Sequence, residues 1–170
     1  MNLYSKIREI PDFPQPGILF RDITPLLADG PAYQQAIGQL AEFAKACDAQ
    51  VIVGPEARGY VVGAPLAYAL GLGFIPVRKK GKLPSTTVSV EYDLEYGKDT
   101  LEVHADAILP GQRVVVADDL LATGGTMFAT IDLVQKLGGQ VVGAAFLIEL
   151  MSLDGRLKLA DIPIKTLMQY

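Results

Sequence analysis

The sequence predicts an α/β fold in which a central parallel sheet is flanked by helices. Short, wholly apolar runs recur along the chain, as in Val114-Val115-Val116-Ala117, and such runs are typical of strands buried on both sides. Segments with helical spacing of apolar residues separate these runs. Strands that alternate with helices form parallel sheets, and such sheets bind ligands at the carboxyl ends of their strands.

The first thirty residues are expected to form an arm in front of this sheet. Residues 3–10 have the spacing of a short amphipathic helix that ends before Pro11. The next stretch, 11–17, holds three prolines, too many for a helix or a strand, and continues into residues 18–22. We therefore expect residues 11–22 to be irregular and semi-rigid.

The rest of the chain alternates between the two kinds of element, and one domain over residues 1–170 is expected from its length. Residues 80–105 differ, because apolar residues alternate with others on both sides of 95–99, which indicates an antiparallel hairpin or hood. The remaining elements are expected as a helix at 31–46, a strand at 51–54, a helix reaching about 70, strands at 73–77 and 114–117, a helix at 127–137, a strand at 141–148, a short helix starting at 152–155 and an edge strand at 162–167.

Composition points to a soluble cytoplasmic protein. Half of the residues are hydrophobic, and the net charge of −4 argues against general affinity for nucleic acid, which needs a basic face. The single cysteine, Cys47, cannot form an internal disulfide, which fits a reducing compartment. Residues 1–13 lack the pattern of a signal peptide, and no apolar stretch reaches the roughly 18 residues of a membrane span.

The strongest functional signal follows the strand at 114–117. Asp118 and Asp119 stand at the expected strand tip, and Thr123-Gly124-Gly125-Thr126 leads into the next helix. Free N–H groups and the helix dipole favour a phosphate at such a turn, and the two carboxylates could hold ribose hydroxyls or a phosphate-bound metal ion. The alternative is an ordinary strand-to-helix turn. A P-loop and a dinucleotide-binding turn do not fit, because Gly-Lys-Ser/Thr and GxGxxG are both missing.

A second strand tip offers another candidate anion site. The sequence Pro55-Glu56-Ala57-Arg58-Gly59 places Arg58 at a helix start, where the dipole does not favour a cation. One explanation is a structural pair between Arg58 and Glu56. The other is that backbone amides and Arg58 hold a diphosphate. Two anion sites on adjacent strand tips would suit a substrate with phosphate groups at both ends.

Two further segments are ambiguous on their own. The run Arg78-Lys79-Lys80-Gly81-Lys82 would by default be a solvated loop, but it follows a strand of the same sheet and can add positive charge beside a diphosphate. Glu95 would by default be a surface acid, but it lies in the hood between Tyr92 and Tyr96. His104 has no second ligand candidate beside it and is expected to be structural.

The segment VVVADDLLATGGT resembles the phosphoribosyl-pyrophosphate (PRPP) signature of the type I phosphoribosyltransferases. From about residue 11 to the end, the chain is similar to adenine phosphoribosyltransferases, through FPQPGILFRDITPLL, VGPEARG, RKKGKLP, LEYGKDTLEVHADAI and DDLLATGGT in this order. The resemblance implies the type I phosphoribosyltransferase fold, a homodimer, and transfer of the 5-phosphoribosyl group from PRPP to N9 of adenine, which gives AMP and pyrophosphate. An enzyme for hypoxanthine, guanine or xanthine, and a PRPP-sensing regulator, remain as alternatives.

The same resemblance implies a role for each matching residue. Glu95 would accept the proton at N7 of the purine, Tyr96 would close the hood, and Arg58 would complete the catalytic set. Magnesium would be bound with PRPP near the two aspartates, without direct protein ligands, and the Glu56–Ala57 peptide bond would be cis. The phosphate and ribose of PRPP would be held by Asp118, Asp119, Ala122, Thr123, Gly124, Gly125 and Thr126. Pyrophosphate would be held by Glu56, Ala57, Arg58, Arg78 and Lys82. Adenine would stack on Phe20, with Leu120 on its other face and its edge read by the backbone of Leu19 and Arg21.

Overall fold

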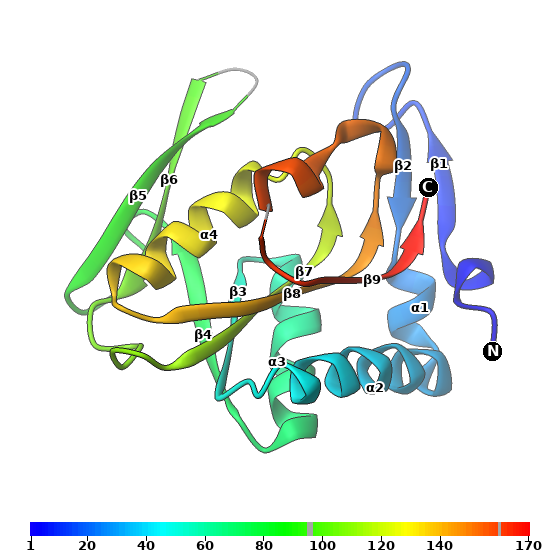
Figure 1. Ribbon diagram of the computed structural model, residues 1–170. Helices are drawn as coiled ribbons and strands as arrows, with labels where there is room; N and C mark the ends of the chain where they lie inside the picture. Colours follow the sequence, from blue (N-terminus) through cyan, green and yellow to red (C-terminus); the bar gives the residue numbers. More distant parts are fainter. Residues whose placement is uncertain (95–96, 160) are drawn as a thin grey trace.

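The protein is described here by a computed structural model, which covers residues 1–94, 97–159 and 161–170. Within these ranges seven strands form one sheet in the order β5-β6-β4-β3-β7-β8-β9 (Figure 1). The strands β4, β3, β7, β8 and β9 run parallel, whereas β6 pairs antiparallel with both β4 and β5. Their bounds are Val51–Pro55 for β3, Gly73–Lys79 for β4, Thr87–Leu94 for β5, Gly97–His104 for β6, Arg113–Leu121 for β7, Gln140–Glu149 for β8 and Ile164–Gln169 for β9. The expected parallel sheet is confirmed.

Helices cover the sheet on both faces, which explains the unbroken apolar runs within its central strands. On β7, Val114 and Val116 belong to the core under α4 (Gly125–Lys136). Val115 and Ala117 point the other way, into the core shared with α2 (Gly30–Ala46) and α3 (Arg58–Leu70). Side chains alternate between the two faces of a strand, so a strand buried on both faces needs an unbroken apolar run.

The N-terminal arm is more regular than its sequence indicates. A 3-10 helix, η1, covers only Leu3–Lys6, and the expected helix at 3–10 is therefore wrong beyond that point. Strand β1 (Arg8–Pro11) pairs antiparallel with β2 (Leu19–Asp22), so the expectation of an irregular segment is wrong for residues 19–22. The prolines at 14 and 16 lie in the turn between these strands, where no ladder hydrogen bond is needed from them. A short helix, α1 (Thr24–Ala28), follows.

The antiparallel hood is confirmed as the hairpin of β5 and β6, which pair from Thr87 with His104 to Leu94 with Gly97. In Figure 1 this hairpin rises at one end of the sheet, beside α4. Among the described residues, no helix combines the length and apolar character needed to cross a membrane.

Two boundaries near the C-terminal half differ from expectation. Strand β7 continues to Leu121, so the aspartates at 118 and 119 lie within the strand and not beyond its tip. The expected last helix is two 3-10 helices, η2 (Met151–Leu153) and η3 (Gly155–Leu159).

Candidate active site

A cavity of about 180 Å³ lies where β7 passes into α4. This volume is below the 300–1,000 Å³ of sites that enclose a whole small molecule, so it suits one phosphorylated end of a larger ligand. The first N–H groups of a helix have no partner inside the helix, and those of α4 start at this cavity. Its lining joins one residue of α3 to a continuous stretch of the chain: Arg58, Asp118, Asp119, Leu120, Leu121, Ala122, Thr123, Gly124, Gly125, Thr126 and Met127.

The turn at the start of α4 depends on glycine. Gly124 is the N-cap of α4 and has a φ of +84°, in the left-handed region that side chains rarely occupy. A Cβ at this position would also lie 2.7 Å from the carbonyl oxygen of Gly155. The backbone therefore bends tightly at Gly124 and can approach a bound phosphate closely.

The two aspartates have different surroundings. Asp119 is buried, and its Oδ2 atom lies 3.0 Å from Nε of Arg58. Asp118 is half-buried and accepts a hydrogen bond of 2.8 Å from the backbone N–H of Asp119. Burial raises the pKa of Asp118 well above its ordinary value of 3.8, and the neighbouring charge of Asp119 raises it further. An additional cation near this pair would stabilise its ionised form.

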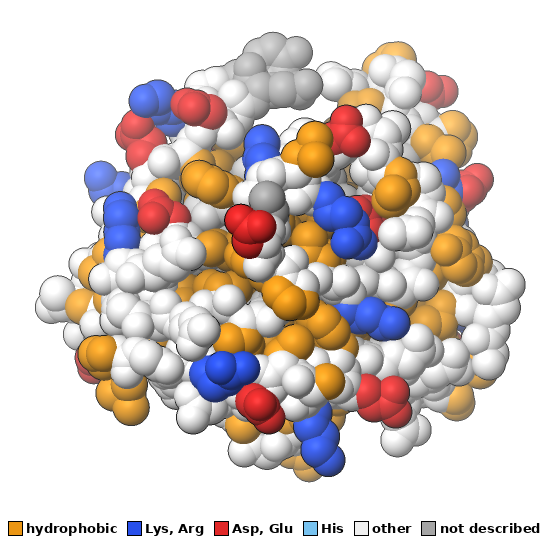
Figure 2. Space-filling view, viewed as in Figure 1, with side chains coloured by type: hydrophobic (Ala, Val, Ile, Leu, Met, Phe, Trp, Pro, Cys, Tyr) orange, Lys and Arg blue, Asp and Glu red, His pale blue; other side chains and the backbone are white. Residues whose placement is uncertain are grey.

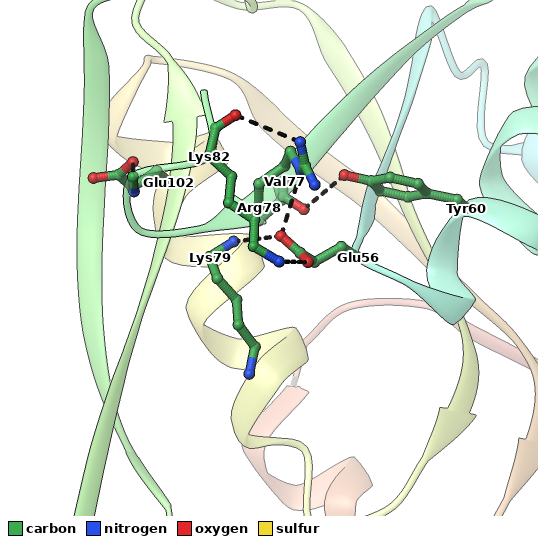
Figure 3. A network of polar contacts seen from close by, with 8 residues as sticks. Glu56, Tyr60, Val77, Arg78, Lys79, Lys82 and Glu102 are labelled. Atoms are coloured by element: carbon green, nitrogen blue, oxygen red, sulfur yellow. Dashed lines mark hydrogen bonds and ion pairs between the residues drawn. The ribbon is translucent and has the colours of Figure 1, made fainter. Parts of the chain in front are cut away.

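The alternative that Arg58 pairs with Glu56 is wrong, since Arg58 pairs with Asp119. Glu56 holds the basic segment instead (Figure 3). Its Oε2 atom lies 2.7 Å from Nζ of Lys82, and its Oε1 atom accepts a hydrogen bond of 2.8 Å from the backbone N–H of Lys79. The Nε atom of Arg78 lies 3.4 Å from Oε1. The structure thus brings Arg78 and Lys82 together around one carboxylate.

Glu56 is ionised in this network. Burial opposes ionisation, but the hydrogen bonds from Lys82 and Lys79 and the charges of Lys82 and Arg78 outweigh it, so the pKa of Glu56 lies below its ordinary value of 4.5. The peptide bond between Glu56 and Ala57 is cis, as expected. Because Arg58 follows directly, the basic segment and the phosphate cavity meet at the start of α3.

The arm places Phe20 next to the same arginine. The guanidinium carbon of Arg58 lies 5.6 Å from the centre of the Phe20 ring, and Phe13 packs edge-on against Phe20 at 5.1 Å between ring centres. The side chain of Arg21 pairs with Glu9, and its guanidinium carbon lies 3.9 Å from the centre of the Tyr170 ring. Arg58 therefore connects the aromatic end of the site with the aspartates.

Four expected site residues, and a histidine that was expected to be structural, remain to be placed. Leu19 is 44% exposed on the arm, and Leu120 lines the cavity. Glu95 and Tyr96 lie outside the described residues. His104 accepts a hydrogen bond of 3.4 Å at Nε2 from the backbone N–H of Ser85, as a structural histidine would.

An ion pair between a buried carboxylate and a half-buried arginine, beside the phosphate turn, has no counterpart in the sequence-based predictions. Arg156 of η3 binds Glu149 at the end of β8 through two hydrogen bonds of 2.7 Å. The only local signal is an acid at the end of an apolar strand, followed seven positions later by an arginine. Such a spacing is too common to identify a pair.

Comparison with known proteins shows to which protein family the chain belongs. Residues 27–161 match the family model of the phosphoribosyl transferase domain. The whole chain is 65% identical to the adenine phosphoribosyltransferase of Brevibacillus brevis over 170 residues, with complete coverage of both chains. It is 57% identical to that of Oenococcus oeni over 173 residues, which covers 100% of this chain and 99% of the relative.

Solved structures agree with the sequence relatives. The crystal structure of adenine phosphoribosyltransferase from Thermoanaerobacter pseudethanolicus superposes with a TM-score of 0.95 at 55% identity, covering 99% of this chain and 98% of the other. The enzyme from Saccharomyces cerevisiae, in complex with an imino-altritol bisphosphate and adenine, gives a TM-score of 0.92 at 38% identity, covering 97% and 96%. The chain belongs to the adenine phosphoribosyltransferase family.

Proposed function

We propose that the protein transfers the 5-phosphoribosyl group of PRPP to N9 of adenine, which gives AMP and pyrophosphate and serves purine salvage. The observation that carries this proposal is the position of Arg58, which lies between Asp119 of the phosphate cavity and the ring of Phe20. One side chain thus connects a site suited to a sugar phosphate with a site suited to an aromatic base. Membership of the family supports the same reaction.

The phosphate end of PRPP would bind at the start of α4. The N–H groups of Gly124, Gly125 and Thr126 and the helix dipole favour the 5′-phosphate there. Asp118 and Asp119 would accept hydrogen bonds from the ribose hydroxyls. Since Asp119 is already fixed by Arg58, its carboxylate is positioned before the ribose arrives.

The pyrophosphate end would bind the cations around Glu56. Cleavage of the bond from C1 of the ribose to pyrophosphate builds negative charge on the leaving group, and Arg58, Arg78 and Lys82 can stabilise that charge. Glu56 keeps two of these cations in place. The backbone of Ala57, next to the cis peptide bond, faces the same end of the site in this proposal.

The donor set at the aspartates fits magnesium that is bound with PRPP. Magnesium usually keeps several of its water molecules when it binds together with substrate phosphates. Asp118 and Asp119 supply two carboxylates that would accept hydrogen bonds from this water, with PRPP as the direct ligand. Bound in this way, magnesium would neutralise charge on the phosphates of PRPP.

Adenine would lie between Phe20 and Leu120. The backbone of Leu19 and Arg21 would bind its Watson–Crick edge, and a 6-oxopurine would leave buried polar groups there without partners. Glu95 would accept the proton from N7 while N9 attacks C1, and Tyr96 would close the hood over the site. A closed hood protects PRPP from water, which would otherwise hydrolyse it.

The protein is also proposed to act as a homodimer in the cytoplasm. A large apolar side chain is exposed on α3, where Tyr68 is 90% exposed, and association over this face would bury it. The chain has a single cysteine, Cys47, which is compatible with a reducing compartment.

The decisive experiment measures AMP formation from adenine and PRPP with magnesium, beside parallel reactions with hypoxanthine, guanine and xanthine. We expect product only with adenine. Product from a 6-oxopurine at a comparable rate would contradict the proposed base specificity. A PRPP-sensing regulator that binds nucleic acid would give no product with any purine. On the face that Figure 2 shows, basic and acidic side chains of the described residues are interspersed, whereas nucleic-acid binding uses a continuous basic surface.

A further inference from the structure

A turn from the C-terminal part of the chain lies directly behind the phosphate loop, defined here as residues 122–126. Figure 1 shows this turn, in orange-red, beside the N-terminal end of α4. The carbonyl oxygen of Gly155 would lie 2.7 Å from a Cβ at Gly124, and a Cβ at Gly155 would collide with the carbonyl oxygen of Ala122. The two backbones therefore touch without side chains between them. Gly155 therefore limits how far the phosphate loop can move toward the C-terminal turn.

The residue after Gly155 is fixed by a fork of hydrogen bonds. Nε and Nη2 of Arg156 each donate a hydrogen bond of 2.7 Å to a different oxygen of Glu149. A bidentate pair fixes direction as well as distance. The Glu149 side chain is only 4% exposed, and it also accepts hydrogen bonds of 3.1 Å from Thr166 and Gln169. Glu149 cannot turn away without breaking this whole set.

Glu149 belongs to the same rigid sheet as the phosphate loop. It is the last residue of β8 and lies in register with Leu121, the last residue of β7. The backbone N–H of Leu150 donates a hydrogen bond of 3.0 Å to the carbonyl oxygen of Leu121. The phosphate loop begins directly after Leu121. The phosphate loop is therefore attached to the sheet in two ways. It follows Leu121 directly along the chain, and its backbone is in contact with Gly155, whose neighbour Arg156 is bound to Glu149 beside Leu121.

We propose that the Arg156–Glu149 pair positions the phosphate loop for the 5′-phosphate of PRPP and AMP. This inference rests on the proposed function. Among the described residues that line the cavity, neither member of the pair is found, so the pair acts through Gly155 and Gly124. Fixed N–H donors bind an anion better than mobile ones, because they need no reorganisation when the anion arrives.

The test compares Arg156→Met with Lys158→Met. Both substitutions remove one positive charge from η3, but Lys158 is exposed, whereas Arg156 carries the fork. We expect Arg156→Met to raise the KM for PRPP and the Kd for ribose 5-phosphate by about tenfold or more, the scale of a misplaced binding group. The KM for adenine should stay near the wild-type value, and Lys158→Met should match wild type in all three.

A milder variant, Arg156→Lys, keeps the charge but loses the fork and should give an intermediate rise in the KM for PRPP. It decides the question if Arg156→Met does not fold. A pair that only stabilises the fold would lower the melting temperature and leave the KM for PRPP and the Kd for ribose 5-phosphate unchanged, and this result would overturn the inference.

A failure of the proposed function can be distinguished from a failure of this inference. If the proposed function is wrong, wild type would form no AMP, but calorimetry with ribose 5-phosphate would still show whether the variants bind it more weakly than wild type. Wild type that binds no ribose 5-phosphate would overturn both.

Discussion

Replacement of Gly124 by alanine tests whether the phosphate loop is held as tightly as the structure indicates. Two costs arise from the one added methyl group. Gly124 has a φ of +84°, and the left-handed conformation is less stable by about 1–2 kcal/mol for a residue that has a Cβ. The same Cβ would lie 2.7 Å from the backbone oxygen of Gly155, and overpacking of this kind typically costs about 1–3 kcal/mol. Together these effects should lower the free energy of unfolding by about 2–5 kcal/mol.

Gly111→Ala is the matched control. Gly111 has a φ of +78°, but its Cβ would meet no atom of the described residues within 4 Å. This variant should therefore lose only the conformational contribution of about 1–2 kcal/mol. Urea unfolding gives both free energies, and thermal unfolding should show about 2–4 °C for each kcal/mol in a protein of this size. The KM for PRPP should rise in Gly124→Ala and stay unchanged in Gly111→Ala.

The outcome that refutes this reasoning is equal behaviour of the two variants. If both lose the same stability, Gly124 does not press against Gly155. If both also keep the wild-type KM for PRPP, the bend at Gly124 is not part of a phosphate site, and the proposed position of the 5′-phosphate is wrong.

Four further predictions concern carboxylates. Glu95→Gln should lower turnover by about 10², the scale of general base catalysis, and leave PRPP binding in calorimetry intact; wild-type turnover would remove Glu95 from the mechanism. Glu56→Gln removes the carboxylate that keeps Arg78 and Lys82 in place, so the KM for PRPP should rise; a KM like that of wild type would contradict the proposed pyrophosphate site. Saturating PRPP with magnesium, at a hundredfold excess over its Kd, should stabilise wild type by about 2.7 kcal/mol. Asp118→Asn combined with Asp119→Asn should abolish that shift in thermal unfolding without destabilising the ligand-free protein, because a raised pKa means that the charge of Asp118 is disfavoured in the folded protein. Glu149 has a pKa below 4.5, chiefly through the hydrogen bonds from its arginine partner, so its stabilising effect is present above pH 4.5 and is lost as the pH falls through the lowered pKa. Urea unfolding of Glu149→Gln should depend less on pH below 4.5 than that of wild type; equal pH dependence would show that this carboxylate is not the cause.

The central sheet could be predicted from sequence because its signal is local. Strands β3 and β7 are covered on both faces, so each of them contains a continuous apolar run whatever its neighbours are. The arm could not be predicted in the same way. Residues 8–11 become a strand only because residues 19–22 pair with them, as Ile10 does with Phe20. Helical spacing within residues 3–10 contains no information about that partner.

The same distinction between local and distant contacts applies to the candidate site. Asp118 to Thr126 could be predicted as one site because strand, turn and helix follow each other directly in the chain. The partners of the cations could not, since Arg58 reaches Asp119 while Glu56, two positions away, holds Lys82. Which acid a long cationic side chain reaches depends on the packing of neighbouring strands. The spacing of residues along the sequence does not contain that information.

The contacts of the arm also have a consequence for the order in which the site forms during folding. The guanidinium carbon of Arg21 lies 3.9 Å from the centre of the Tyr170 ring, and the backbone N–H of Gln169 donates to the hydroxyl of Tyr4 across 165 positions of sequence. Contacts between such distant residues stabilise a chain only after the entropy of a very long loop has been lost.

The strand, turn and helix around Gly124 join residues close in sequence, so we expect their backbone N–H groups to be protected from hydrogen exchange early during refolding. The contact of Gly155 behind this turn forms later, because Glu149 is held by Thr166 and Gln169 of β9. The arm also docks only after β9 has joined the sheet, so a refolding chain would form the phosphate turn before either end of the site is ready for its ligand.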